Sequence, residues 1–278
     1  MTINEFHKDV RQKRRFEFGK NWKNFLNKLT NERIQIAENS LIKMLDVNNL
    51  ENKKFIDIGS GSGLSSLSAK NLGAKVLSFD YDETSVWCTK SLKKKYYDKD
   101  ENWIVKQGSI LDLNFVNSLG KYDIVYSWGV LHHTGKMWSA IDNSISLVDD
   151  NGKYFISIYN DQGFKSHFWW MVKWLYNILP GFLKKIFAYS LGFFIIFLML
   201  IKYTIKLKPM VILGPMFNYK QSRGMSMLTD IVDWYGGFPY EFASYEYLIN
   251  YIENKGFKFC KGKRTTSFGC NEIVFTKL

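Results

Sequence analysis

The sequence predicts an α/β fold built around a parallel β-sheet. Short apolar runs alternate with helical patterns between residues 54 and 160. A glycine-rich turn joins the first of these runs to a helix, and 46% of the residues are hydrophobic, enough for a sizeable core. Strands that alternate with helices in this way form βαβ units, whose strands lie parallel in one sheet.

Length and composition exclude several other classes. The chain has 278 residues, 17% aromatic residues and only 4 prolines, which excludes a disordered, collagen-like or proline-rich protein. The length fits one large domain or two small ones. The 3 cysteines, Cys88, Cys260 and Cys270, form no CxxC pair, so a disulfide scaffold and a zinc ribbon are also excluded. A reducing, cytoplasmic setting is expected.

Two helices are expected before the sheet, as an N-terminal helical cap over residues 1–50. Residues 16–30 predict a basic amphipathic helix, and residues 31–45 predict a second helix with its own apolar stripe. The first helix places these apolar residues on one face: Phe18, Trp22, Phe25, Leu26 and Leu29. Residues 1–30 lack the apolar stretch of a signal peptide.

The sheet itself is predicted over residues 51–161 and 243–278. Five strands are expected at 54–59, 74–80, 102–108, 122–128 and 152–160. Helices are expected at 63–73, 83–95, 136–148 and 244–255, and two final strands at 257–262 and 271–276. Apolar runs that end at glycine or polar turns are typical of buried strands.

The glycine-rich turn, "FIDIGSGSGLSSLSAK" (55–70), predicts a nucleotide-type cofactor site. The strand leads to Gly59, Gly61 and Gly63, and a helix begins at once. Glycines allow a tight turn and a close backbone approach to a ligand, and the start of a helix favours an anionic group. Asp80 ends the next strand, where a carboxylate can accept both ribose hydroxyls. NAD, FAD and S-adenosylmethionine all fit such a loop, although dehydrogenases usually have their third glycine one residue later.

Three motifs narrow this choice: the D-x-G-x-G-x-G form beginning at Asp57, "QGSILDL" (107–113), and "YDIVYSWGVLHHT" (122–134). With them the chain resembles the class I S-adenosylmethionine-dependent methyltransferases, above all the ubiquinone-biosynthesis methylases and small-molecule O-methyltransferases. The resemblance implies a Rossmann-like, doubly wound seven-stranded sheet with an antiparallel last strand. It also implies S-adenosylmethionine as cofactor and S-adenosylhomocysteine as product. The implied cofactor contacts are Asp57, Gly59, Ser60, Gly61, Gly63, Asp80, Tyr81, Ser109, Ile110 and Ser127.

His132 and His133 are the candidate catalytic residues. They follow the fourth strand, at the sheet edge where ligands bind in such folds, and histidine is the natural base near neutral pH. The quinone methylases have "LEH" where this chain has "LHH", so His133 matches the family's histidine and His132 replaces its acid. Because some relatives bind a divalent metal through that acid, no metal ligand is predicted here. His132 is favoured as the base. His133 is either the base itself or a residue that fixes the loop through a backbone hydrogen bond.

Residues 162–229 break the alternation and contain nine basic residues but no Asp or Glu. Their longest apolar run, 186–201, is shorter than the roughly 20 residues of a transmembrane helix. A single span would also put strand five and the final strands on opposite sides of a bilayer. Residues 162–242 are therefore expected to form a helical insertion that serves as a buried lid, an interfacial membrane helix or a dimer interface. The tryptophans Trp169, Trp170 and Trp174 favour membrane-surface contact through 164–208 or a lid over a greasy substrate.

The segment "RGMSMLTDIVDWYGGFPYE" (223–241) is a candidate substrate loop. An arginine can clamp a carboxylate or phosphate, carboxylates can bind hydroxyls, and aromatic rings can stack on a ring. The alternative is a structured loop whose charges pair with each other. The candidate substrate-binding residues are Trp128, Arg223, Asp233, Trp234 and Glu241.

The net charge of +12 raises the question of a nucleic-acid partner. Residues 162–229 carry nine of these charges, however, and the catalytic sheet is slightly acidic. "SWGV" follows the fourth strand in place of the N/D-P-P-Y motif that grips an amino group of a base, so nucleic acid is not the expected partner. We expect a methyltransferase for a small lipophilic or glycan-related acceptor, with oxygen favoured, located peripherally on the inner face of the membrane. An RNA methyltransferase and a non-catalytic cofactor-binding protein are the alternatives, and the sequence predicts no oligomeric state.

Overall fold

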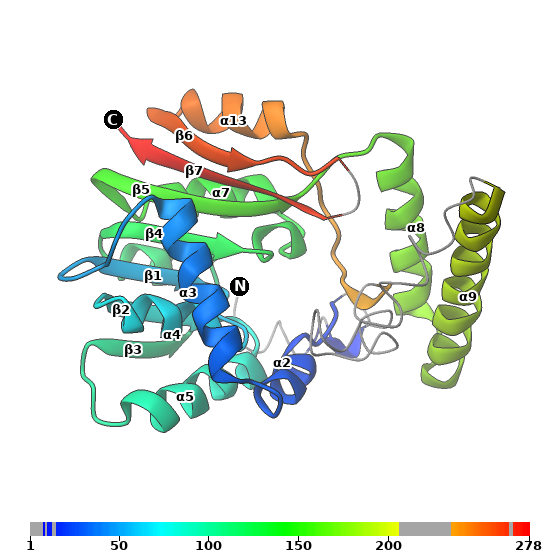
Figure 1. Ribbon diagram of the computed structural model, residues 1–278, viewed down its shortest axis with the longest axis horizontal. Helices are drawn as coiled ribbons and strands as arrows, with labels where there is room; N and C mark the ends of the chain where they lie inside the picture. Colours follow the sequence, from blue (N-terminus) through cyan, green and yellow to red (C-terminus); the bar gives the residue numbers. More distant parts are fainter. Residues whose placement is uncertain (1–7, 9, 13–14, 206–234, 267–268) are drawn as a thin grey trace.

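The computed structural model describes residues 8, 10–12, 15–205, 235–266 and 269–278 (Figure 1). At its centre lies a seven-stranded sheet with the order β3-β2-β1-β4-β5-β7-β6. The strands from β3 to β5 pair in parallel, whereas β7 runs antiparallel to both β5 and β6. The doubly wound seven-stranded sheet with an antiparallel last strand is thereby confirmed.

The elements follow the predicted order closely. The strands are β1 (Lys54–Ile58), β2 (Lys75–Asp80), β3 (Trp103–Gln107), β4 (Tyr122–Trp128), β5 (Val148–Tyr159), β6 (Phe257–Lys263) and β7 (Cys270–Lys277). The helices are α2 (Gly19–Leu26), α3 (Asn31–Leu45), α4 (Leu64–Asn71), α5 (Glu83–Tyr97), α6 (Leu113–Asn117), α7 (Met137–Ile145), α8 (Phe164–Ile178), α9 (Gly181–Ile205) and α13 (Tyr245–Glu253). A short 3-10 turn, η1 (Leu131–His133), follows β4.

Helices cover both faces of the sheet. Adjacent strand residues point to opposite faces, so Phe55 packs in the core beneath α3, α4 and α5, whereas Ile56 packs in the core beneath α6, α7 and α13. Burial on both faces explains why these strands are continuous apolar runs. The strand order reverses between β1 and β4, and ligands bind such sheets at the carboxyl ends of the strands where this reversal occurs.

The first helix is shorter than predicted. The expected helix over 16–30 is α2, limited to Gly19–Leu26, and the next helix begins after Thr30, whose side chain caps it by accepting from the Arg33 N–H. The Gly19 N–H donates to the Asp82 carboxylate over 2.8 Å, and the Phe16 N–H donates to the Phe238 carbonyl over 3.1 Å. These long-range hydrogen bonds hold the residues before α2 across the sheet edge instead of in a helix.

The helices α8 and α9 project from the side of the molecule, with α9 outermost (Figure 1). The helix α9 has 25 residues, more than the apolar run of 186–201, and is long and apolar enough to cross a membrane. Length and composition do not distinguish a spanning helix from an interfacial one. The strand β5 before the insertion pairs with β7 after it from Lys153 to Tyr159, and a single crossing would separate these two strands.

Candidate active site

The turn after β1 adopts backbone conformations that require glycine. Gly59 and Gly61 have φ angles of 75° and 54°, in the left-handed region. A Cβ atom on Gly59 would lie 2.3 Å from Val130, and one on Gly61 would lie 2.9 Å from the Trp22 indole nitrogen. The turn is therefore packed between the loop after β4 and helix α2, and Trp22 itself lines the cavity beside it.

Asp80 is placed where a ribose-binding carboxylate is expected. Its Oδ2 accepts from the Gly61 N–H and its Oδ1 accepts from the Asp82 N–H, both over 2.9 Å. Each carboxylate oxygen keeps lone pairs that can accept a ribose hydroxyl. Burial raises the pKa of the Asp80 carboxyl to about 7. Tyr81, Ser109 and Ile110 line the same part of the cavity, so this chain has both the polar and the apolar groups that an adenosine cofactor needs.

Three of the predicted cofactor residues have structural contacts of their own. The Asp57 carboxylate accepts from the Ser66 hydroxyl over 2.5 Å, which ties β1 to α4, and burial raises its pKa to about 6. Asp57 still lines the cavity, but Gly63 and Ser127 do not. Gly63 caps α4, and the buried Ser127 hydroxyl donates to the Ile58 carbonyl. These two residues support the loop from behind, and their direct contact with the cofactor stays a prediction.

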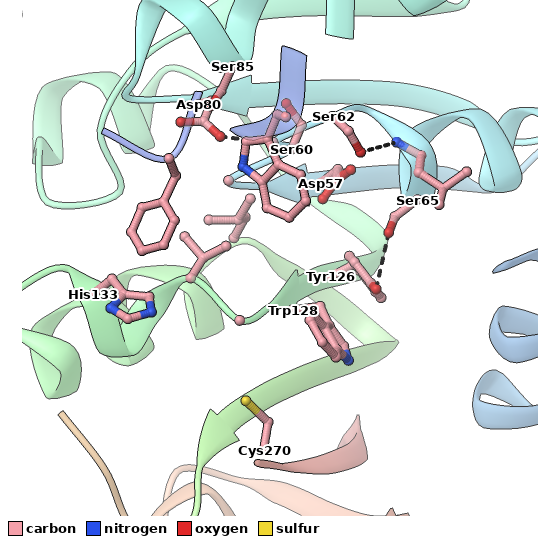
Figure 2. A pocket seen from close by; sticks show the side chains of 18 of the residues that line it. Asp57, Ser60, Ser62, Ser65, Asp80, Ser85, Tyr126, Trp128, His133 and Cys270 are labelled. Atoms are coloured by element: carbon pink, nitrogen blue, oxygen red, sulfur yellow. Dashed lines mark hydrogen bonds between the residues drawn. The ribbon is translucent and has the colours of Figure 1, made fainter. Parts of the chain in front are cut away.

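One large cavity runs from the glycine turn to the insertion. Its volume of about 1750 Å³ exceeds the roughly 300–1,000 Å³ of a typical ligand site, which leaves room for a cofactor and a second molecule. Figure 2 shows Asp80, Ser60 and Asp57 at one end and Cys270 at the other, with Trp128 between them. The end far from the turn is lined by Trp128, Tyr159, Ile196, Tyr235, Arg264 and Cys270.

The two histidines of η1 line this cavity in opposite tautomers. The His132 Nδ1 accepts from the Tyr159 N–H over 3.3 Å, so its neutral ring carries the proton on Nε2. That Nε2 is buried and has no hydrogen-bond partner among the described residues. The His133 Nδ1 lies 2.6 Å from the Pro239 carbonyl, which can only accept, so Nδ1 carries the proton and Nε2 keeps the lone pair. His133, rather than the favoured His132, can thus take a proton through Nε2 without losing its hydrogen bond.

Burial keeps both histidine rings neutral. Burial lowers the pKa of His133 to about 3, and the positive charges of Lys173 and Arg15 act in the same direction. Burial likewise lowers the pKa of His132, with smaller contributions from His133 and Lys173. The two ring centroids are 4.5 Å apart. A neutral His133 retains its lone pair throughout the physiological pH range.

Lys173 is one of the nine basic residues of the insertion, yet it points inward. Its side chain is 0% exposed, and its Nζ lies 5.0 Å from the Tyr240 ring centroid and 6.0 Å from that of Tyr159. The Tyr159 ring in turn lies 4.1 Å from the His132 ring. Burial lowers the pKa of the Lys173 ammonium to about 7. Helix α8 therefore places a titratable amine behind the histidine pair, which no sequence pattern indicated.

The role of Arg15 was not predicted from the sequence. Its guanidinium donates to the carbonyls of His133, over 2.8 Å, and Thr134, over 3.1 Å, and lies 5.6 Å from the Tyr81 ring centroid. Phe18 packs against the His133 ring at 4.9 Å. The segment before α2 thus joins the cofactor end of the cavity to the histidine turn. The signal was the aromatic and basic run at 15–22, which has no partner visible in the sequence.

The predicted substrate residues divide into three groups. Trp128 lines the cavity and is half exposed. Glu241 does not line the cavity, because both of its carboxylate oxygens accept from the Met137 N–H at the start of α7 over 3.1 Å. Its assignment as a substrate residue is corrected to an anchor for α7. The remaining candidates, Arg223, Asp233 and Trp234, lie outside the described residues. Within the residues that the structure does describe, no cluster of three or more His, Cys, Asp or Glu side chains could hold a metal.

Comparisons with known proteins agree with this geometry. Residues 56–154 match the family model described as a methyltransferase domain. Magnesium protoporphyrin IX methyltransferase (ChlM) from Synechocystis PCC 6803, solved with bound SAH, has a TM-score of 0.53 at 15% identity, over 88% of this chain and 84% of that one. PKMT2 from Rickettsia typhi, in complex with AdoHcy, has a TM-score of 0.57 at 15% identity, over 87% of this chain and 52% of that one. An O-methyltransferase family protein from Burkholderia thailandensis has a TM-score of 0.50 at 10% identity, over 88% and 55%. No curated protein matches the chain in sequence.

The sheet order, the glycine turn and the carboxylate that ends β2 define a class of enzyme that uses an adenosine cofactor at the β1–β4 switch point. Residues 56–154 thus form a methyltransferase domain, and the fold around it is that of the class I S-adenosylmethionine-dependent methyltransferases. Three solved structures of this fold contain SAM or SAH, which agrees with the S-adenosylmethionine site that the glycine turn and Asp80 predict.

Proposed function

We propose that this enzyme methylates a small, lipophilic acceptor at an oxygen atom. The size and lining of the cavity carry this proposal. Beyond the residues around the glycine turn, the cavity continues past Trp128 and Tyr159 to Tyr235 and to Ile196 of the apolar helix α9. Aromatic and aliphatic walls of this kind favour an apolar acceptor, whose burial is driven by the hydrophobic effect.

The chain's own residues account for holding the cofactor. Asp80 would accept the ribose hydroxyls, Tyr81 and Ile110 would contact the adenine, and the backbone of the glycine turn would face the remaining polar groups. When bound there, S-adenosylmethionine supplies an electrophilic methyl group on a sulfonium. Much of the rate of such a transfer comes from holding the acceptor atom close and in line.

An oxygen acceptor must lose its proton, and His133 is placed to take it. Its low pKa of about 3 makes it a weak base, so it takes the proton as the oxygen gains the methyl group and that proton becomes strongly acidic. Its Nδ1 is fixed by the Pro239 carbonyl, so the lone pair of Nε2 is available for the acceptor's proton. The protonated His132 Nε2 is buried and has no partner among the described residues, so His132 lies behind His133 and supports it through ring contact. His133 would thus be the base, and His132 a positioning residue.

The comparisons give limited support to this assignment. One structure of similar fold is a magnesium protoporphyrin IX methyltransferase and another is an O-methyltransferase family protein. At 15% and 10% identity their acceptors do not transfer to this chain. A glycan-related acceptor carried on a lipid would also fit a cavity whose far wall carries Arg264 and Glu272.

Transfer of a labelled methyl group tests the proposal. Purified enzyme is incubated with methyl-labelled S-adenosylmethionine and, separately, an organic-phase lipid extract, an aqueous metabolite extract and total RNA from the same cells. We expect the label in the organic phase. A methyl ether would keep the label in acid, and a methyl ester would release it as methanol in alkali, so either result identifies methylation at oxygen. The Asp80→Asn variant is the control for enzyme-independent methylation. Label in RNA alone, or in water-soluble metabolites alone, would contradict the proposal.

A further inference from the structure

We propose that α8 and α9 form a docking surface for an anionic lipid bilayer, with α9 lying flat on the membrane. The proposal goes beyond methyl transfer and does not depend on the identity of the acceptor. The surface, called the apolar face below, consists of the exposed large hydrophobic residues of the two helices. On α8 these are Phe164, Phe168, Trp170, Met171, Trp174, Leu175 and Ile178. On α9 these are Phe182, Ile186, Phe193, Phe194, Phe197, Leu198, Ile201 and Ile205.

The exposed residues of α9 lie on one side of the helix. Phe182, Ile186, Phe193 and Phe197 recur at intervals of four and seven residues, which places them in one stripe. The opposite side packs against the rest of the insertion through the fully buried Ala188 and through partly buried neighbours. At about 1.5 Å per residue, the apolar side of this 25-residue helix is about 37 Å long. A continuous apolar stripe of this length differs from the singly scattered hydrophobic residues of an ordinary surface and marks an interaction surface.

Exposure of this whole face to water would be unfavourable, because apolar surface is more stable when it is removed from water. Only 12% of the most apolar part of α9 is buried within the molecule. In α8, by contrast, Trp169, Val172 and Tyr176 are buried, so this helix is anchored to the core on one side and exposed on the other. The pair is thus attached firmly through α8 and presents α9 outward, as Figure 1 shows.

Charge favours a lipid surface over a second copy of the chain. Neither helix contains an Asp or Glu, and Lys165 and Lys202 are exposed on them. A symmetric dimer through α9 would bring lysines of the two copies together without carboxylates from these helices to offset them. An anionic bilayer instead offers acyl chains for the apolar residues and negative headgroups for the lysines. Trp170 and Trp174 suit the boundary between these layers.

The sheet fixes the orientation of α9. Since β5 and β7 pair directly, the insertion leaves and re-enters the same domain on one side of the membrane. A helix that lies in the interface satisfies this constraint, whereas a single span does not. Ile196 of α9 also lines the cavity, so the docked helix would border both the bilayer and the acceptor site. The enzyme would then sit peripherally on the cytoplasmic face, within reach of acceptors dissolved in the membrane.

Vesicle binding by the full chain tests the proposal. Flotation is measured with phosphatidylcholine vesicles and with vesicles containing 30% phosphatidylglycerol, at NaCl concentrations from roughly 50 to 500 mM, a range over which screening becomes strong. We expect binding to the anionic vesicles that weakens as salt rises. The double variant Phe193→Ser/Phe197→Ser should bind about tenfold more weakly or worse, because each exposed phenylalanine contributes through burial in the interface.

Ile104→Ser is the matched control, because Ile104 is an exposed apolar residue on the edge strand β3 and does not line the cavity. It should bind vesicles as the wild type does, and all variants should bind S-adenosylmethionine with unchanged affinity, which verifies folding. Absence of vesicle binding by the wild type would overturn the proposal, and so would equal binding by the double variant. Self-association that the double variant abolishes, without vesicle binding, would identify a second copy as the occupant instead. None of these readouts involves methyl transfer, so failure here is distinct from failure of the proposed function.

Discussion

The two ends of the cavity are built in different ways. The cofactor end is made by a few short segments that directly follow β1, β2 and β3, and its hydrogen bonds link residues such as Gly61 and Asp80 across neighbouring strands. The acceptor end collects side chains from the N-terminal segment, η1, β5, the insertion and the final strands. The cofactor, which many enzymes share, would thus be bound by local turns of the sheet. The methyl acceptor, which differs from enzyme to enzyme, would be bound by the elements added around the sheet.

The largest expected effect is at the cofactor end. Asp80→Asn keeps the shape of the side chain but removes its charge and one acceptor oxygen. We expect the Kd for S-adenosylmethionine to rise about 100-fold, because hydrogen bonds to a charged group each contribute about 1.5–3 kcal/mol. Isothermal titration calorimetry measures this directly. Asp123→Asn, which alters an exposed carboxylate far from the cavity, is the control. An unchanged Kd for S-adenosylmethionine in Asp80→Asn would contradict the assignment of Asp80 to the cofactor end of the cavity.

His133 tests the acceptor end. His133→Asn keeps a donor near the Nδ1 position for the Pro239 carbonyl but has no group at Nε2. We expect kcat to fall about 100-fold, since general-base catalysis contributes roughly 10²–10⁴-fold, while the cofactor Kd stays the same. His132→Asn should have the smaller effect on kcat, because His132 already carries its proton on Nε2. A larger fall in kcat for His132→Asn than for His133→Asn would instead identify His132 as the base.

Lys173 is a buried charge of the insertion, in contrast to the exposed Lys165 and Lys202. Burial lowers the pKa of Lys173 to about 7, well below the roughly 10.4 of an unfolded lysine. Between these values the unfolded chain binds one more proton at this site than the folded chain, so stability rises with pH. The rise approaches about 1.4 kcal/mol per pH unit. Denaturant unfolding at pH 7.5 and 9 should show about 2 kcal/mol of extra stabilisation in the wild type that Lys173→Met lacks.

The matched control for Lys173 is Lys165→Met, which removes an exposed lysine from the same helix. Its pH dependence should equal that of the wild type. The other titratable groups are present in every variant, so the difference between variants reports on Lys173. If the unfolding free energy of Lys173→Met changes with pH as that of the wild type does, the Lys173 amine is solvated in the folded protein. That result would contradict its burial between Tyr159 and Tyr240.

The smallest expected effect is the pH dependence of cofactor binding. Burial raises the pKa of Asp80 to about 7, and only the ionised carboxylate has both oxygens free to accept hydroxyl protons. Affinity should therefore fall as pH drops through 7, by about tenfold between pH 8 and pH 6. Calorimetry across this range measures the change. Asp80→Asn should bind weakly but without this dependence, and a wild-type Kd that is flat with pH would contradict the assignment.

Much of the sheet was predictable because its signals are local. A strand that ends in glycine, or a helix that begins after a capping Asp82 or Thr30, is determined by residues adjacent in sequence. The cofactor residues Asp80, Tyr81, Ser109 and Ile110 line the cavity as expected because each directly follows a strand of the parallel sheet. Gly63 and Ser127 lie outside the cavity wall, since a motif marks which residues build a turn but not which of them face the cavity.

The acceptor end depended on contacts between residues far apart in sequence. Which ring nitrogen of each histidine carries the proton was decided by Pro239 and by the Tyr159 backbone. Glu241 serves α7 rather than a substrate, and Lys173 lies on the buried side of α8 among aromatic rings, beside the buried Val172. The sequence by itself determined the fold class, the cofactor and the presence of an apolar, basic insertion. Only the tertiary structure decided which side chains form the acceptor site, because hydrogen-bond partners and burial are properties of packed segments, not of local pattern.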